Sequence, residues 1–239
     1  MTRAQAFEPQ PLGSTFTRGV SQHLRDLGIA TWRAATEHPM VREIGAGTLP
    51  HDRFRWYFEQ NILYLEDYAR ALGLILGHAP DGDALDVVSR FAAQIVHTEL
   101  PANRQFLQRL GGDVDAIDPL ETMHPVAYAY TRHLLQVAGQ GTCPEGLTAV
   151  LPCQWSYGEL AVHVAAHVPD DPVSADWIAM FANDEYDQLV AESTSLLDRL
   201  AASLDATGLR RLEWIFAASE RYEVEFWDMA YAGPPSSKQ

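Results

Sequence analysis

The chain has 239 residues, 47% of them hydrophobic and 10% aromatic, so it is long enough to bury a substantial core. Its formal net charge of −15 argues against a nucleic-acid partner, because binding phosphates needs a basic face. No apolar run reaches the roughly 18 residues that span a membrane, and the N-terminus lacks the apolar core of a signal peptide. The two cysteines have no zinc-ligand or CxxC spacing, so we expect a reduced, cytoplasmic protein.

Long segments with apolar residues at helical spacing follow one another along the chain, separated by proline, glycine and polar turns. They predict helices over residues 14–36, 51–78, 84–110, 125–139, 145–167, 173–200 and 209–231. Pro101 is expected to bend the third helix, and the helical segment after Pro172 to divide near Phe181. A further short turn is expected over residues 41–46.

No run of alternating apolar and polar residues is long enough to predict a strand. The expected fold class is therefore all-α, a single-domain helical bundle over residues 14–232. Residues 1–13 are rich in proline and polar side chains, and we expect them to form a flexible arm. Residues 233–239 are expected to form a flexible tail.

Pro152 lies inside the fifth predicted helix, and it should kink or restart that helix because it has no N–H. Cys153 would then lie near exposed backbone N–H groups, which would lower the pKa of its thiol. Tyr157 lies one turn further on the same face. From composition alone an inert core cysteine is favoured over a nucleophile, since free cysteine usually behaves as a small buried residue.

Two polar residues fall within or beside apolar stripes. Asn61 could be a core amide bonded to a neighbouring helix, or a group that faces a pocket. Glu223 lies three residues before Phe226, and burial there would raise its pKa towards the range useful for proton transfer. A solvated position at the edge of the stripe is favoured, because glutamate is seldom buried unpaired.

The predicted helices also carry tyrosines that could converge with these groups in the bundle core. Tyr64, Tyr130 and Tyr157 would form aromatic walls suited to a flat heteroaromatic substrate, with a few polar groups to read its edge. His163 and His167 are one turn apart, but no third ligand is evident, so no metal site is expected.

Four groups of motifs, spread from about Phe16 to Tyr231, are specific when taken together. They are His38-Pro39 with Gly47-Thr48-Leu49, Phe54-x-x-Tyr57-x-x-Gln60 with Tyr64-Leu65, Leu151-Pro152-Cys153-x-Trp155-x-Tyr157, and Tyr222-Glu223-x-x-Phe226-Trp227-x-Met229-Ala230-Tyr231. In these motifs the chain resembles the TenA (thiaminase II) family, whose fold is like that of haem oxygenase but which binds no haem.

The resemblance implies an aminopyrimidine aminohydrolase of thiamin salvage. Such an enzyme hydrolyses 4-amino-5-aminomethyl-2-methylpyrimidine, and thiamin is a second candidate substrate, at the pyrimidine methylene carbon. The resemblance implies Cys153 as the nucleophile that attacks the ring and Glu223 as the acid and base. Tyr64, Tyr130 and Tyr157 match positions that line the pyrimidine site. The family also implies a homotetramer that uses no metal or organic cofactor.

Two substrate-site positions depart from the family pattern. Asn61 stands where the family has Asp, and Phe181 lies near a position that is often Tyr. Asparagine can pair with an aminopyrimidine edge as it does with adenine, but it supplies no negative charge to a protonated ring. The departures leave two alternatives open: a hydrolase of the same fold with a different heteroaromatic substrate, or a non-catalytic pyrimidine-binding or regulatory protein.

Overall fold

The structure, a computed structural model, describes residues 19–235 and contains no β-strand within them. Its α-helices are α1 (Val20–Leu27), α2 (Ile29–Thr36), α3 (Pro39–Ala46), α4 (His51–Gly77), α5 (Gly82–Gln94), α6 (Leu100–Arg109), α7 (Pro119–Thr122), α8 (Pro125–Gln140), α9 (Cys143–Val164), α10 (Pro172–Phe181), α11 (Asp184–Ala201) and α12 (Ala206–Ala232). A π-helical turn, η2 (Ile95–Glu99), joins α5 to α6, and a 3₁₀ turn, η3 (Val114–Ala116), precedes α7. The prediction of an all-α bundle is confirmed.

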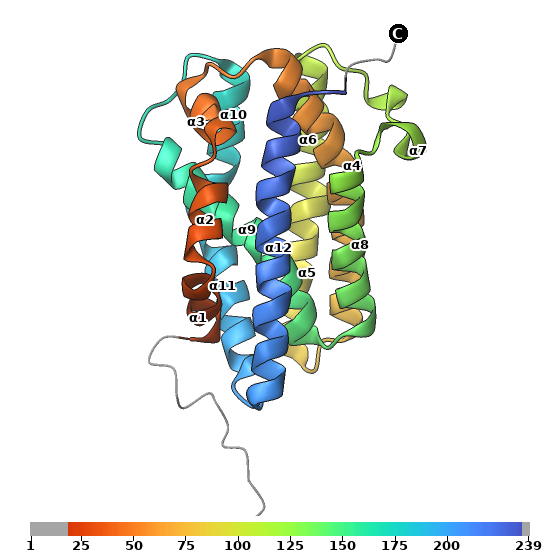
Figure 1. Cartoon of the computed structure of the whole chain (residues 1–239), viewed down its shortest axis with the longest axis vertical. Helices are drawn as coiled ribbons and strands as arrows, with labels where there is room; N and C mark the ends of the chain where they lie inside the picture. Colours follow the sequence, from red (N-terminus) through yellow and green to blue (C-terminus); the bar gives the residue numbers. More distant parts are fainter. Residues whose placement is uncertain (1–18, 236–239) are drawn as a thin grey trace, which may run out of the picture.

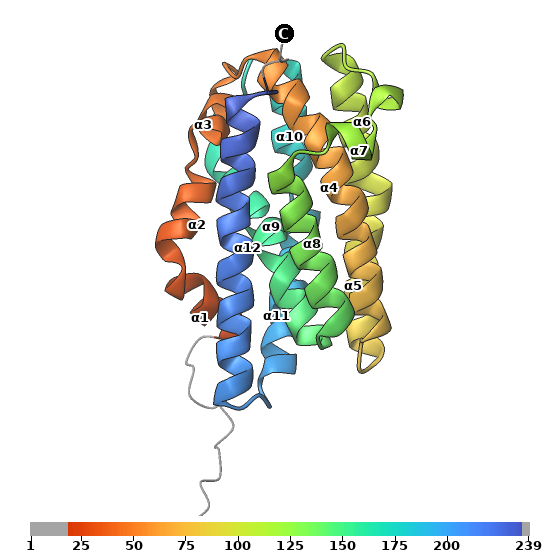
Figure 2. The same ribbon diagram turned by 45° about the vertical axis from the view of Figure 1, so that its right-hand side comes forward.

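The long helices run side by side along one axis, while α3, α7 and α10 lie towards the end at which α12 finishes (Figure 1). Figure 2 shows α8 between α12 and α4, and α8 packs against both of them. Helix α9 packs against α4, α8, α11 and α12. It buries residues on all sides, as expected for a helix that is apolar all round.

The largest fully buried side chains are mostly aromatic, and they fill the space between these helices. They are Trp32, Trp177, Trp227, Tyr57, Tyr68, Tyr130, Phe54, Phe58, Phe91, Phe181, Phe216 and Leu24. No helix within residues 19–235 is long and apolar enough to cross a membrane.

The prediction of one helix over residues 14–36 is wrong in one respect. The described part of this segment forms two helices, α1 and α2, that meet at Gly28. The Glu220 carboxylate of α12 occupies the space that a Cβ at this position would take, so a larger residue there would displace that carboxylate. The expected helix start at Ser14 or Thr15, the arm at residues 1–13 and residues 236–239 of the tail lie outside the described residues.

The break expected near Pro101 takes the form of the π-helical turn. Pro101 has no N–H to donate and its ring crowds the carbonyl one turn earlier, so the regular i→i−4 pattern cannot continue. The Leu100 N–H instead bonds to the carbonyl of Ile95, five residues back. Single π turns inside α-helices occur frequently at functional sites.

Pro152 does not interrupt α9, which is helical without a break from Cys143 to Val164. The expected restart at Pro152 is therefore wrong. The side chain of Pro152 is buried, and packing against the four surrounding helices holds α9 together around it. Consequently Cys153 does not lie at the N-terminus of a helix.

Candidate active site

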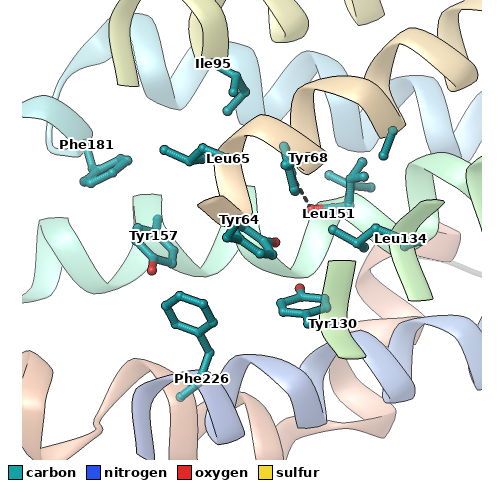
Figure 3. Packing of buried hydrophobic residues seen from close by; sticks show 14 of the residues in the cluster. Tyr64, Leu65, Tyr68, Ile95, Tyr130, Leu134, Leu151, Tyr157, Phe181 and Phe226 are labelled. Carbon is teal, nitrogen blue, oxygen red and sulfur yellow. Dashed lines mark hydrogen bonds between the residues drawn. The ribbon is translucent and has the colours of Figure 1, made fainter. Parts of the chain in front are cut away.

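Aromatic rings from five helices meet inside the bundle (Figure 3). Tyr64 of α4 lies 5.0 Å from Tyr130 of α8 and 5.5 Å from Phe226 of α12, between ring centroids. Tyr157 of α9 lies 5.1 Å from Phe181 of α10. All five residues are buried. The structure thus brings Tyr64, Tyr130, Tyr157 and Phe181, which come from distant parts of the sequence, into one continuous aromatic cluster.

The carboxylate of Glu223 points into this cluster rather than into solvent. Its Oε1 accepts a 2.6 Å hydrogen bond from the Tyr130 hydroxyl, and the residue is 4% exposed. Burial raises the pKa of Glu223 to about 7, although hydrogen bonds from Tyr130 and Cys153 act to lower it. The solvated position that the sequence favoured is wrong, because the hydrogen bonds of these two side chains make burial of the carboxyl tolerable.

Cys153 lies in the same cluster. Its thiol lies close enough to Glu223 for each group to change the pKa of the other, and a thiolate there would raise the pKa of Tyr57, Tyr64 and Tyr68 of α4. Cys153 is partly accessible, whereas these tyrosines are buried. The role of Cys153 as a nucleophile stays a prediction, with an inert core position as its alternative.

The pKa of the Cys153 thiol is raised well above its usual range, first by burial and then by the charge of Glu223. The lowered pKa expected from Pro152 is therefore wrong, since the unbroken helix leaves no free N–H groups beside the sulfur. The Tyr64 hydroxyl makes no hydrogen bond of good geometry to described residues, but it lies close enough to the sulfur to lower the thiol pKa in part.

Asn61 is buried, and its amide is held by a chain of hydrogen bonds. Its Nδ2 donates to Asn103 Oδ1 over 2.9 Å, and Asn103 Nδ2 donates to the carbonyl of Glu99 over 2.8 Å. Because a carbonyl can only accept, the chain fixes the orientation of both amides. Asn61 is thus bonded to a neighbouring helix, and no residue from 19 to 235 hydrogen-bonds to its Oδ1 or to its second side-chain N–H.

Sequence reasoning missed several polar residues that surround the cluster. The Tyr57 hydroxyl lies 3.1 Å from that of Tyr157, and the Tyr186 hydroxyl donates to the carbonyl of Gln154 over 3.0 Å. Asn103 and Glu99 were missed as well. The one available signal was a polar residue within an apolar stripe, and Tyr57 carries no such signal because tyrosine is common in cores.

Between residues 19 and 235 no three His, Cys, Asp or Glu side chains are grouped so as to hold a metal ion. His163 and His167 are both exposed on the outside of the bundle. The groups that the site presents are a thiol, a carboxyl, hydroxyls and an amide.

Comparisons with known proteins identify the family. The model of the TENA/THI-4/PQQC family matches residues 29–233. An aminopyrimidine aminohydrolase of Halalkalibacterium halodurans is 36% identical over 208 residues, which cover 84% of this chain and 90% of that protein.

Solved structures agree with this assignment. The TenA homologue protein from P. horikoshii OT3 has a TM-score of 0.80 at 30% identity, and the match covers 91% of this chain and 100% of that one. A Shewanella denitrificans domain with a haem oxygenase-like fold has a TM-score of 0.67 at 14% identity and covers 88% of this chain and 91% of its own, which supports the fold alone. The predicted haem-oxygenase-like fold is thus confirmed, and the chain belongs to the TENA/THI-4/PQQC family.

Proposed function

We propose that this protein is an aminopyrimidine aminohydrolase of thiamin salvage, with 4-amino-5-aminomethyl-2-methylpyrimidine as its first candidate substrate and thiamin as its second. The prediction of a hydrolase is confirmed by aminohydrolase relatives that cover most of the chain. The observation that carries the proposed mechanism is the contact of the Cys153 thiol with Glu223, a carboxyl whose pKa is about 7.

The first half of the proposed reaction uses Cys153 as nucleophile and Glu223 as base, then acid. As the sulfur bonds to the ring carbon beside the one that bears the aminomethyl group, the thiol proton passes to the Glu223 carboxylate. The electron pair gained by the ring then expels the amine from the methylene carbon, and Glu223 returns the proton to it. Ammonia leaves, and an exocyclic methylene remains on the sulfur-bound ring.

The second half reverses these steps with water. Glu223 takes a proton from water as the oxygen bonds to the methylene carbon. The electron pair returns through the ring and breaks the carbon–sulfur bond, and Glu223 reprotonates the sulfur. One water is consumed, and the hydroxymethyl pyrimidine and ammonia are released. A carboxyl with a pKa of about 7 suits these transfers, because it gives and takes protons readily near neutral pH.

The surrounding residues have positioning roles in this proposal. Tyr130 holds the Glu223 carboxyl by its 2.6 Å hydrogen bond. The rings of Tyr64 and Tyr157 supply faces on which a flat substrate stacks, and Phe181 supports Tyr157. Asn61 offers Oδ1 and one N–H to the aminopyrimidine edge.

Turnover of the two candidate substrates tests the proposal. The protein is incubated with the aminomethyl pyrimidine or with thiamin, and the hydroxymethyl product is followed by chromatography. Cys153→Ser should lose at least 100-fold in turnover. Cys143→Ser should retain it, since Cys143 is buried at the start of α9 near Asp81 and Arg199. A folded wild-type protein that turns over neither compound would overturn the proposal.

The neutral Asn61–Asn103 chain favours one second candidate, a hydrolase of the same mechanism with another heteroaromatic substrate. Turnover of other ring amines with none of the aminomethyl pyrimidine would support it. Calorimetry that finds tight pyrimidine binding without any turnover would instead favour a binding protein. The homotetramer and the cytoplasmic location implied by the family stay predictions, and light scattering on the purified protein measures the first.

A further inference from the structure

Glu99 is a second buried carboxyl near the proposed site, and the mechanism above does not use it. It ends the π-helical turn η2 and is 6% exposed. Within residues 19–235 no side chain donates a hydrogen bond to it or forms an ion pair with it, and its Oε1 is fully covered by protein atoms. A buried carboxyl without a partner is costly, so its presence calls for an explanation.

Glu99 acts electrostatically on the thiol and on three of the buried tyrosines around it. Its charge raises the pKa of Cys153, of Tyr57 and Tyr68 on α4 and of Tyr186 on α11. Glu99 therefore acts on the same sulfur as Glu223 does, that of Cys153.

The carboxyls of Glu99 and Glu223 come from different elements of the bundle. Glu223 belongs to α12, whereas Glu99 belongs to the connection between α5 and α6. In Figure 3, Ile95 at the start of the π turn and Phe226 of α12 lie on opposite sides of Tyr64. Burial is the cause that raises the pKa of Glu99, to about 8. Within residues 19–235 the Glu99 carboxyl has no partner that would compete with a bound cation.

The backbone of Glu99 is also tied to the substrate-edge residue. Its carbonyl accepts from Asn103, which in turn accepts from Asn61. One short segment thus orients the neutral amide and carries the unpaired carboxyl. Asn61 itself supplies no negative charge, whereas the Glu99 residue at the other end of this hydrogen-bonded chain carries a carboxyl that can ionise.

We propose that Glu99 is a substrate-binding residue whose carboxylate pairs with the positive charge of a heteroaromatic amine, and so makes the site selective for cationic over neutral ring substrates. The inference rests on the proposed function for the identity of the ring. It adds a residue and a charge preference to that function.

The test compares two pyrimidines that differ in charge. The aminomethyl pyrimidine carries an ammonium group at neutral pH, whereas the hydroxymethyl pyrimidine is uncharged there. Calorimetry in the Cys153→Ser background measures the binding of both without turnover. We expect Glu99→Gln to weaken the binding of the aminomethyl compound at least tenfold and the binding of the hydroxymethyl compound less than threefold.

Glu220 provides a matched control, because it is also buried, has an unpaired Oε1 and has a pKa raised by burial to about 8. It packs against Gly28 instead of the thiol. Glu220→Gln should leave both affinities within threefold. Equal weakening of both compounds by Glu99→Gln, or weakening of neither, would overturn the inference.

Proton release gives a readout that a purely structural role would not move. A protonated Glu99 must ionise to pair with a cation, so binding of the aminomethyl compound at pH 7 should release more protons from the parent than from Glu99→Gln. Repeating the calorimetry in buffers of different ionisation enthalpy measures this difference, and an identical release would count against the inference. If Glu99→Gln does not fold, Glu99→Leu is the second variant, because replacing buried ionisable groups by apolar residues of similar volume is often neutral for stability.

The two proposals fail separately. Wild-type turnover with no charge-selective effect of Glu99→Gln would remove the role of Glu99 alone. Charge-selective binding without wild-type turnover would remove the hydrolase mechanism and leave the role of Glu99 standing. If neither pyrimidine binds to the folded protein, both proposals fall.

Discussion

The Tyr130 hydroxyl donates a 2.6 Å hydrogen bond to Glu223 Oε1 and so joins α8 to α12 inside the aromatic cluster. This bond stabilises the ionised carboxylate and acts against the burial that raises the Glu223 pKa to about 7. The pKa of the proposed acid and base is therefore set by two opposing effects, burial and hydrogen bonding, and the Tyr130 hydroxyl contributes to the second.

Tyr130→Phe removes that oxygen and should raise the pKa of Glu223. A hydrogen bond to a charged group is worth about 1.5–3 kcal/mol, which corresponds to about one to two pKa units. In the pH profile of kcat/KM, the limb that requires ionised Glu223 should move to higher pH by this amount. Tyr157→Phe is the control, because that hydroxyl bonds to Tyr57. An unmoved limb in Tyr130→Phe would contradict the role given to this bond.

Glu223→Gln should remove proton transfer while keeping the fold. Glutamine has nearly the same shape, and its amide oxygen can still accept from Tyr130. We expect kcat/KM to fall by about 10²–10⁴, the usual contribution of a general acid or base. Steady-state kinetics measures this, with Glu220→Gln as the control that retains activity. A loss of less than tenfold would exclude Glu223 from the chemistry.

The thiol of Cys153 should react slowly in the free protein. Its pKa is raised well above its usual range, so little thiolate is present at pH 7. In a Cys143→Ser background we expect alkylation by iodoacetamide at less than a tenth of the rate of a small free thiol, still rising at pH 9. Mass spectrometry of the labelled protein follows the reaction. A plateau below pH 8 would instead mean a thiol with a lowered pKa, as the position of Pro152 in the sequence suggests.

Helical periodicity and the family motifs were enough to predict the bundle and to bring Cys153, Glu223 and the tyrosines into one site. They were not enough to predict the electrostatics. A local rule about proline gave the wrong sign for the thiol pKa, because burial between four helices outweighs whatever Pro152 does to its own helix. The rule that glutamate is solvated failed at Glu223 for a similar reason, since its partners come from distant parts of the chain.

Glu99 and Asn103 escaped sequence reasoning because of the π turn. Helical spacing of 3.6 residues assigns side chains to faces only while the regular pattern holds. The wider turn over Ile95–Glu99 shifts the faces of the helix that follows, so counting from α5 does not tell which residues of α6 point inward.

The free energy of unfolding should decrease as pH rises because of Glu220, which lies outside the proposed site. Burial raises its pKa in the folded protein to about 8, whereas an unfolded glutamate titrates near 4.3. The folded state therefore holds a proton that the unfolded state has lost at intermediate pH. The stabilising contribution is fully present below pH ~4.3 and is lost as pH rises to about 8.

Glu220→Gln isolates this effect because glutamine does not titrate. The free energy of unfolding of wild type, relative to the variant, should decrease by on the order of 2 kcal/mol between pH 5 and 8, a value reduced from the full shift by partial screening. Urea unfolding of both proteins at several pH values measures the difference, in which the titration of all other groups cancels. A constant difference across this range would mean that Glu220 is already ionised in the folded protein. Because the carboxyl packs against Gly28, the same series reports how firmly the junction of α1 and α2 is held to α12.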